Sequence, residues 1–203
     1  MSKEKNKGND ILIAATKIFC DKGFGKTNIS EIADIAGVGK GTVYEYFRSK
    51  EELFLHVVEY YKEEYISRLK ERMEESNSFQ DKIDQFIDFN REVVEIKMKH
   101  IELITKGSGG SLPDTTRESF KIIIKTLHQE VIKILMDVLS IGETEGILRP
   151  FNKGLAADMF FEMTMRHCFR IITGKYDAKH VAKEKQELIE LFINGVGFRG
   201  ECN

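Results

Sequence analysis

Small and polar side chains gather between residues 39 and 46, where they could contact a polyanion and the edges of its bases. Lys40 carries an ammonium group that could reach a guanine edge or a phosphate. Gly41 has no side chain, so that the backbone could approach the bases closely. Thr42 offers a hydroxyl group to a base edge and a methyl group to a thymine. These residue types predict hydrogen bonding to a nucleic acid.

Three further side chains of the same segment would either bind phosphates or be repelled by them. Tyr44 and Tyr46 bring phenol hydroxyl groups that can donate to phosphates, although Tyr46 also lies partly toward the expected core. Glu45 is repelled by phosphates, so that two interpretations remain open. Its carboxylate accepts a hydrogen bond from a cytosine amino group, or it pairs with Arg48 or Lys50, and we favour the pairing.

Two short helices joined by a glycine turn must position these side chains. Asn28 and Glu31 have the spacing of a capping box, which starts the first helix, and Gly37 supplies the left-handed residue that ends it. Ser49 and Glu52 form a second capping box, which starts the next helix. Apolar residues recur at helical spacing on the side expected to face inward: Ile29, Ile32, Ala33, Ala36, Val43 and Phe47. This pattern predicts a helix-turn-helix, whose second helix enters the major groove of DNA.

The run IADIAGVGKGTVYEYFRSKEEL resembles the DNA-binding signature of tetracycline-repressor-type (TetR) regulators, and the similarity extends from Ile11 to Leu53. The resemblance implies an all-α protein made of two domains. The N-terminal domain, residues 1–48, is a three-helix helix-turn-helix domain. The larger one, residues 49–203, is a helical effector-binding and dimerisation domain.

Two positions near the helix-turn-helix match phosphate-contacting sites of the resembled family. Thr27 precedes the second helix and Lys50 lies in the first turn of the fourth, so that free backbone amides accompany both side chains. Gly39 replaces the serine or threonine often found there in the family, so that one capping hydroxyl is missing. The complete set of candidate DNA-binding residues is Thr27, Gly39, Lys40, Gly41, Thr42, Tyr44, Glu45, Tyr46 and Lys50.

The net charge of the 203 residues is −2, but the charge is unevenly distributed. Residues 1–50 hold nine lysines and arginines against six aspartates and glutamates, whereas the remaining chain holds 22 against 27. The positive end coincides with the predicted helix-turn-helix, as binding to phosphates requires. Because the excess is modest, tight binding at cellular salt would need two such domains acting together.

The composition also bounds the class of protein. Hydrophobic residues make up 41% of the chain and charged residues 32%, which is typical of a soluble, mostly helical protein. No apolar run reaches the roughly 18 residues that cross a bilayer, and no signal-peptide core follows the first lysines. Cys20, Cys168 and Cys202 share no metal-binding or redox spacing. We therefore expect reduced thiols in a cytoplasmic protein with no membrane partner, no metal and no cofactor.

A nucleotide-binding loop is the one competing motif. The segment GVGKGT resembles the end of a P-loop, but that loop needs a glycine where Asp34 stands and a strand where a helix is predicted. The sequence also lacks a nucleophile–base pair and a metal-binding spacing. We therefore expect no enzyme activity. A helical enzyme or small-molecule carrier with an incidental helix-turn-helix is the alternative from another class.

Amphipathic helices are predicted along the whole chain. The first runs from Asn9 to Lys22 and ends at Gly23. The polar leader before it, residues 1–8, is either mobile or an arm that reaches the minor groove. Later helices are expected at Ser49–Glu75, Phe79–Ile104, Thr115–Glu145, Lys153–Ile172 and Lys179–Val196. The intervening Gly107–Pro113 segment is either a surface loop or a gate beside a ligand pocket.

The second domain offers two sets of candidate residues. The helix over residues 153–172 has two adjoining apolar faces, and the resemblance implies a four-helix seam across a two-fold axis. The candidates for this dimer interface are Phe161, Met165, Cys168, Leu188, Leu191, Phe192 and Gly195. The resemblance also implies an effector pocket. Its candidate lining residues, each of which also suits a plain core, are Phe86, Phe89, Phe120, Leu127, His128, Phe160, Met163 and His167.

These observations favour a homodimeric repressor that binds a palindromic double-stranded DNA operator. A small apolar or aromatic effector, which could carry one acidic group, would release it. A DNA-binding activator and a repressor that needs no ligand are the close alternatives.

Overall fold

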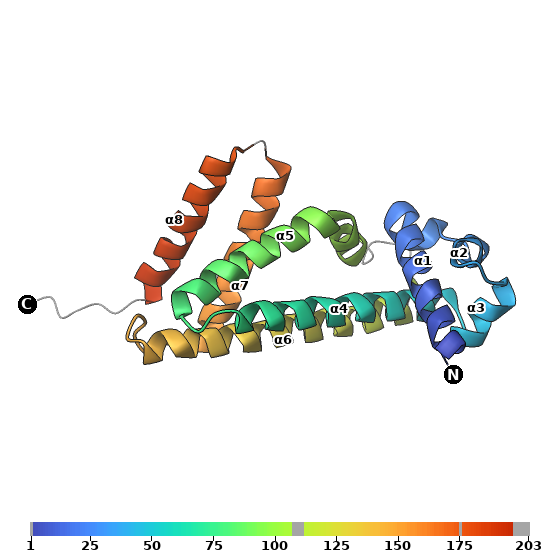
Figure 1. Ribbon diagram of the computed structural model, residues 1–203, viewed down its shortest axis with the longest axis horizontal. Coiled ribbons are helices and arrows are strands. Elements are labelled where there is room, and N and C mark those ends of the chain that lie inside the picture. The colour runs from blue at the N-terminus through green and yellow to red at the C-terminus, as the bar shows by residue number, and fades with distance from the viewer. Residues whose placement is uncertain (1, 107–111, 175, 197–203) are drawn as a thin grey trace, which may run out of the picture. The chain divides into compact units, whose positions relative to one another are not determined.

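The computed structural model describes the backbone of residues 2–106, 112–174 and 176–196, and within these ranges it describes the side chains of residues 7–95, 112–174 and 176–195. Every regular element of this part of the chain is an α-helix (Figure 1). The helices are α1 (Ser2–Lys26), α2 (Ile29–Ala36), α3 (Lys40–Tyr46), α4 (Lys50–Glu74), α5 (Phe79–Lys106), α6 (Asp114–Thr144), α7 (Lys153–Thr173) and α8 (Ala178–Val196). The predicted all-α class is confirmed.

The ends of α4 to α8 lie within two residues of the predicted ends. The first helix differs, because α1 begins at Ser2 rather than Asn9 and includes the leader that was expected to be mobile. Gly23 interrupts α1 as predicted, with a φ of 73° that favours glycine. Most of the predicted linker, residues 107–111, lies outside the described residues.

Side chains cap the helices around the turn, although not always as reciprocal boxes. The Asn28 side chain accepts a hydrogen bond from the Ser30 amide, but Glu31 pairs with Lys22 at 2.8 Å instead of returning to residue 28. The second box is closer to the prediction. Ser49 Oγ accepts from the Glu52 amide at 3.1 Å, while Glu52 Oε2 accepts from the Arg48 amide rather than from that of Ser49. Both helices therefore start where the sequence predicts.

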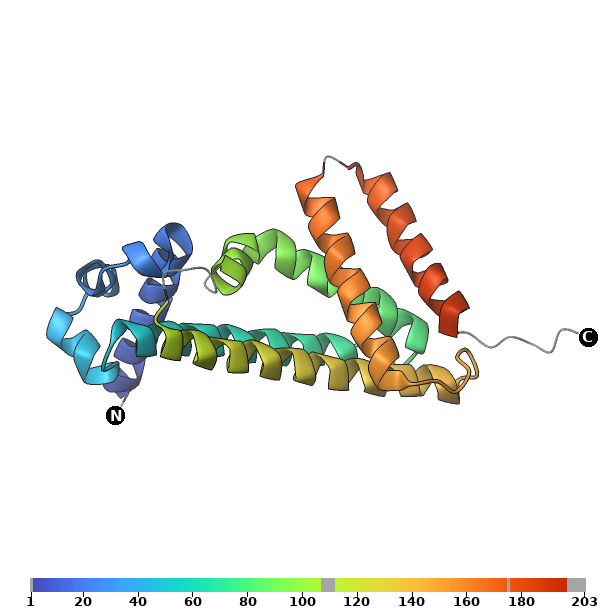
Figure 2. The same ribbon diagram turned by 180° about the vertical axis from the view of Figure 1, so that it is seen from behind.

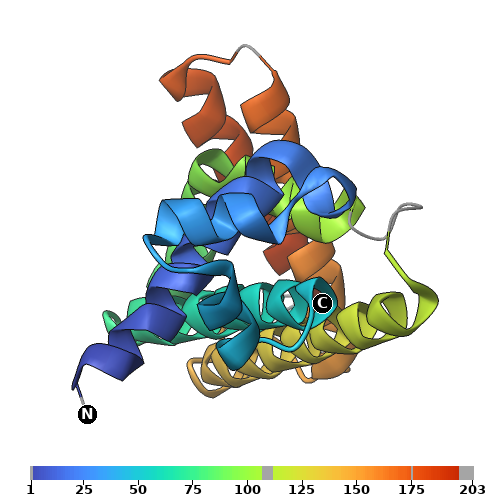
Figure 3. The same ribbon diagram turned by 90° about the vertical axis from the view of Figure 1, so that its right-hand side faces the viewer.

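The first of two compact units comprises residues 1–64 and 97–126. Its core centres on Phe19, Phe24 and Phe54, whose ring centroids lie 5.3 to 6.1 Å apart. Helices α1, α2 and α3, nearest the viewer in Figure 3, enclose this core. The predicted inward residues of α2 and α3 are buried in it, apart from the half-buried Ala36: Ile29, Ile32, Ala33, Val43 and Phe47.

The second unit comprises residues 65–96 and 127–203. Helices α7 and α8 pack as an antiparallel pair, which is clearest in Figure 2. Phe160 of α7 contacts both Phe86 and Phe192, with ring centroids 5.8 and 4.6 Å away. The hydroxyl of the half-buried Tyr65 donates to Asn90 Oδ1 at 2.7 Å, and desolvation raises the pKa of this tyrosine. Aromatic side chains thus pack among the aliphatic residues that make up most of this core.

Helix α4 contributes side chains to both cores. Leu53, Phe54 and Val57 are buried in the first unit, whereas Ile66, Leu69 and Met73 are buried in the second. The helix is continuous from Lys50 to Glu74, so the same element takes part in both cores. The functional boundary that we predict between residues 48 and 49 remains a prediction.

Candidate functional site

Helix α3 exposes the polar residues that the sequence singles out. Lys40, Gly41, Tyr44 and Glu45 are exposed and Thr42 is half-buried. Val43 is fully buried on the opposite side of the helix. Gly39 caps α3 without a side-chain hydrogen bond, as expected from the missing hydroxyl. The helix therefore presents one polar face, held in place by an apolar face.

Tyr46 differs from Tyr44 in its surroundings. Its ring centroid lies 6.5 Å from that of Phe47, and its edge lies so close to Gly8 that a Cβ atom there would be 3.2 Å from Tyr46 Cδ1. Tyr44 is more exposed, at 45% against 37% for Tyr46. Both phenols lie at the surface, and Tyr46 is also packed on the first turns of α1.

The ion pair expected for Glu45 is absent. Within the described residues, Glu45 forms no pair with Arg48 or Lys50, so the interpretation that we favoured is wrong. The reason is that Lys50 is directed elsewhere. Its Nζ donates to the backbone oxygens of Phe24 and Thr27 at 3.0 and 3.1 Å. Glu45 keeps its carboxylate exposed on the same surface as Lys40.

Lys50 fastens the start of α4 to the turn between α1 and α2. In addition to its two hydrogen bonds, its ammonium group lies 4.4 Å from the centroid of the Phe24 ring. Thr27 belongs to the same turn, is only 5% exposed, and donates its hydroxyl proton to the Gly23 oxygen at 2.7 Å. Both residues predicted to grip phosphates thus have structural partners. Sequence reasoning missed these bonds because their acceptors are backbone atoms, which no residue type reveals.

The predicted effector residues are divided between the two cores. Phe86, Phe89 and Phe160 are fully buried in the core of the second unit. Phe120 belongs to the core of the first unit, where its ring lies 6.1 Å from that of Phe54. Leu127 is partly buried against the second core. These phenylalanines pack within the two cores, and their assignment to an effector pocket remains a prediction.

The two histidines of that set have different environments. His128 lies at the surface, with its side chain 38% exposed and Nε2 3.0 Å from Asp158 Oδ1, which contradicts the expected core position. His167 is buried, and its Nδ1 lies 3.7 Å from Glu184 Oε2. Desolvation lowers the pKa of His167, while the nearby Glu184 charge opposes that shift. Met163 and His167 line a small groove between α7 and α8.

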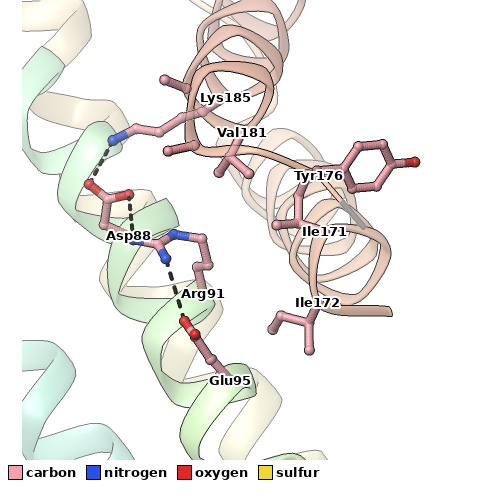
Figure 4. Close-up of a pocket in the computed structure, with 10 residues that line it drawn as sticks. Asp88, Arg91, Glu95, Ile171, Ile172, Tyr176, Val181 and Lys185 are labelled. Carbon is pink, nitrogen blue, oxygen red and sulfur yellow. Dashed lines mark hydrogen bonds and ion pairs between the residues drawn. The ribbon is translucent and has the colours of Figure 1, made fainter. Parts of the chain in front are cut away.

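A larger cavity of about 560 Å³ lies between α5, the end of α7 and the start of α8 (Figure 4). One wall is the polar face of α5, formed by Asp88, Arg91 and Glu95. The other wall is mostly apolar and contains Ile171, Ile172, Tyr176, Ala178, Val181 and Ala182, with Lys185 at its edge. None of the predicted effector residues lines it. The sequence signal for this cavity was the spacing of the charged residues on α5. The same spacing is typical of a helix face in solvent, so it did not identify the cavity.

The residues predicted for the dimer face differ in their exposure, and the face itself remains a prediction. Cys168 is fully buried, with Sγ 3.9 Å from the Ile87 oxygen, and Phe192 and Leu188 are buried in the same unit. Burial also raises the pKa of the Cys168 thiol to about 12. Phe161 and Met165 are only half-buried. Of the predicted residues, Leu191 is 71% exposed and Gly195 is exposed as well, so these two remain available to a partner.

Other apolar side chains are exposed instead. Leu155, Met159 and Phe169 of α7 are 58%, 53% and 51% exposed. They alternate along the helix with the charged Glu162 and Arg166. The exposed apolar surface of the α7–α8 pair is therefore Leu155, Met159, Phe169 and Leu191, which we call the α7–α8 surface.

Two negative findings apply to the described part of the chain. No group of three or more histidine, cysteine, aspartate or glutamate residues has an arrangement that could hold a metal ion. None of the helices has the length and apolar character needed to traverse a bilayer.

The fold and the exposed α3 define a helix-turn-helix DNA-binding protein with a second helical domain. Residues 11–57 match the family described as bacterial regulatory proteins, tetR family. The match extends from within α1 to the first turns of α4 and so covers the helix-turn-helix.

Relatives cover nearly the whole chain. The fatty acid metabolism regulator protein of Bacillus subtilis (strain 168) is 27% identical, over 97% of this chain and 98% of its own. The transcriptional repressor KstR2 of Mycolicibacterium smegmatis is 25% identical, over 73% and 71%.

Solved structures share the fold. FadR from Bacillus subtilis, in complex with stearoyl-CoA, superposes with a TM-score of 0.71 at 22% identity, over 93% of this chain and 98% of that one. A TetR-family regulator from Mesorhizobium loti superposes with a TM-score of 0.76 at 19% identity, over 98% and 100%.

Proposed function

We propose that this regulator is a homodimeric repressor that leaves a palindromic operator when a small apolar molecule occupies its second unit. The observation that carries the proposal is the continuity of α4. Its first residue, Lys50, is hydrogen-bonded to the turn before α2, and its last turns are buried in the core of the second unit. The names of two relatives, a fatty acid metabolism regulator and a repressor, support the same kind of function.

The operator contacts that we propose come from the polar face of α3. Lys40, Thr42 and Tyr44 carry the donors that can reach bases and phosphates, and Gly41 allows close approach. Glu45 has no partner ion within the described residues, so we assign its carboxylate to a cytosine amino group. Gly39, Tyr46 and Thr27 complete the proposed set, although the Thr27 amide itself donates to the Phe24 oxygen at 3.3 Å.

Lys50 has a different part in this scheme. An ammonium group has three protons, and two of them are directed at backbone oxygens. The third could still reach a phosphate, but its main contribution is to orient α2 and α3 relative to the start of α4. Loss of Lys50 should therefore lower both the stability of the first unit and the affinity for DNA.

Dimerisation through the α7–α8 surface would supply the second DNA-binding domain. Burying Leu155, Met159, Phe169 and Leu191 against a second copy would remove exposed apolar area from water. Two copies related by a two-fold axis meet half-sites about one DNA turn apart, roughly 34 to 36 Å. Two modestly positive domains then add their phosphate contacts.

Effector binding would act through the equilibrium between two arrangements of α4. A coupling of about 1–3 kcal/mol between the two sites corresponds to a roughly 5- to 150-fold change in operator affinity. Because Lys50 fixes α2 to α4, a displacement of α4 would carry α3 with it. The two copies of α3 would then lose their spacing. A regulator that acts on chromosomal DNA in this way is cytoplasmic.

Fluorescence anisotropy with labelled duplex from the region upstream of the coding sequence tests the proposal. We expect a complex of two chains per duplex, which dissociates when an apolar ligand fills the second unit. Binding that no pocket-filling ligand alters would refute the effector-responsive part. A transcription assay on the same DNA separates repression from activation, since one relative over 39% of the chain, FasR of Mycolicibacterium smegmatis, is named an activator.

A further inference from the structure

We propose that the cavity between α5, α7 and α8 binds a hydrophobic molecule with one free carboxylate, which Arg91 receives. The cavity has two unlike walls, as Figure 4 shows. Charged side chains come from α5, and the opposite wall consists largely of apolar side chains from α7 and α8. The inference deepens the proposed function, on which it rests for the assumption that the second unit takes an effector.

The spacing of residues creates the two walls. Asp88, Arg91 and Glu95 recur every three or four residues, so they share one face of α5. Val181 and Lys185 share one face of α8 for the same reason. A volume of about 560 Å³ lies within the range of about 300–1,000 Å³ that is typical of small-molecule sites. A ligand between these walls must be amphipathic, with a body against the apolar wall and a polar head toward α5.

Lys185 already pairs with two carboxylates. Its Nζ lies 2.6 Å from Asp84 Oδ2 and 2.7 Å from Asp88 Oδ2, and its side chain is 16% exposed. These distances are those of charge-assisted hydrogen bonds. A new anion would have to compete with two carboxylates for this ammonium group, so Lys185 does not select the head group.

Arg91 is the cation that remains available. Its closest approaches to carboxylates are 3.5 Å to Glu95 Oε2 and 3.9 Å to Asp88 Oδ1, which exceed the usual range of hydrogen-bond distances. The side chain of Glu95 is 62% exposed, so it can turn into solvent at little cost. A planar guanidinium group with unsatisfied donors matches a carboxylate in a bidentate arrangement.

The same contacts argue against a cationic head group. Asp88 is held by Lys185 at 2.7 Å, and a ligand cation would have to displace that bond. They also argue against a coenzyme A thioester as the preferred form. A thioester carbonyl carries no charge, so it gains less from Arg91 than an ionised carboxylate does. The ligand class is therefore a free hydrophobic carboxylic acid in its ionised form.

Isothermal titration of the full chain with four probes of equal chain length tests this assignment. The probes are dodecanoate, dodecanol, dodecyltrimethylammonium and dodecanoyl-CoA, each below its aggregation concentration. We expect dodecanoate to bind at least roughly tenfold more tightly than the other three, the factor that charge-assisted hydrogen bonds supply. Shorter carboxylates should lose about fourfold per methylene group. A preference for the alcohol, the ammonium or the thioester would overturn the inference.

Variants locate the head group. Arg91→Gln should abolish the preference for dodecanoate over dodecanol, and Arg91→Lys, which retains the charge without the fork, should keep part of it. Arg166→Gln, at an exposed arginine of α7 outside this cavity, is the matched control and should change nothing. Ala182→Phe should weaken all probes by filling the cavity without a change in charge. An unaltered preference in Arg91→Gln would overturn the assignment. If Arg91→Gln fails to fold, a preference fully kept in Arg91→Lys together with unchanged affinities in Ala182→Phe would overturn it.

Operator release is measured separately, so the two proposals can fail independently. If dodecanoate binds through Arg91 but leaves the DNA complex intact, the site is correct and the repressor mechanism is wrong. If another compound releases DNA equally well from wild type and Arg91→Gln, the repressor mechanism holds and this site is wrong.

Discussion

Replacing Lys50 by methionine removes the ammonium group and keeps most of the apolar stem. Two hydrogen bonds are lost, to the backbone oxygens of Phe24 and Thr27, together with the contact to the Phe24 ring at 4.4 Å. A hydrogen bond with a charged donor contributes about 1.5–3 kcal/mol, and a cation–π contact at an exposed site about 0.5–1 kcal/mol. Because Lys50 is only half-buried, solvent screens both interactions. We therefore expect a loss of about 2 kcal/mol.

Lys40→Met is the matched control. Lys40 is exposed and has no hydrogen bond or ion pair with any described residue, so its loss should change stability by less than about 0.5 kcal/mol. Urea unfolding followed by circular dichroism gives the free energy of unfolding of both variants. Hydrogen exchange of the amides between residues 23 and 30 shows whether the loss is local.

DNA binding separates the two lysines further. Lys40→Met should weaken binding and reduce the slope of log affinity against log salt by about one unit per protomer. Lys50→Met should weaken DNA binding as well. Unlike Lys40→Met, it should also reduce the protection of backbone amides against hydrogen exchange in the turn before α2. Equal stability of Lys50→Met, Lys40→Met and wild type would show that the Lys50 bonds contribute nothing, and the proposed fastening of α2 to α4 would be refuted.

Three further predictions concern the rest of the chain. Leu191→Glu together with Phe169→Glu should convert the dimer into monomers in sedimentation, and a dimer that persists would remove the α7–α8 surface from consideration. Gly142→Ala should lower the free energy of unfolding by about 1–3 kcal/mol, because the new Cβ would lie 2.8 to 2.9 Å from Leu148 and Phe79 atoms. In the same urea titration, Gly154→Ala should lower it far less, because a Cβ there would lie 3.6 Å from its nearest neighbour. Burial lowers the pKa of His167 in the folded protein, so the unfolded chain binds a proton at this residue first as the pH falls below about 6.5. The free energy of unfolding should therefore decrease from that pH down to the pKa of His167 in the folded state. His167→Gln should remove this pH dependence of stability.

The helices and the helix-turn-helix were predictable because their signals are local. Capping residues at Asn28 and Ser49, the left-handed Gly37 and apolar residues at helical spacing all act within a few positions of the chain. The start of α1 was missed, because its first turn carries no capping signal and no apolar stripe. Local sequence signals therefore predict the order of the helices, and the helix boundary that they missed lies at the N-terminus.

The surfaces and the cavity were not predictable in the same way, because tertiary packing decides which side of each helix is covered. Cys168 and Phe169 are adjacent in sequence, yet one is fully buried and the other is 51% exposed. Sequence patterns assigned Cys168 to a partner and overlooked Phe169. The cavity depends on which side chains of α5 face α8, and the role of Lys50 depends on two backbone oxygens more than 20 positions away.

One titration tests dimeric recognition through α3 most directly. Full-length chain is added to the labelled upstream duplex at several salt concentrations, and both the stoichiometry and the salt slope are recorded. We predict two chains per duplex, an affinity that falls steeply with salt, and a shallower slope for Lys40→Met. A single chain per duplex, or no binding even in dilute buffer, would contradict the central claim.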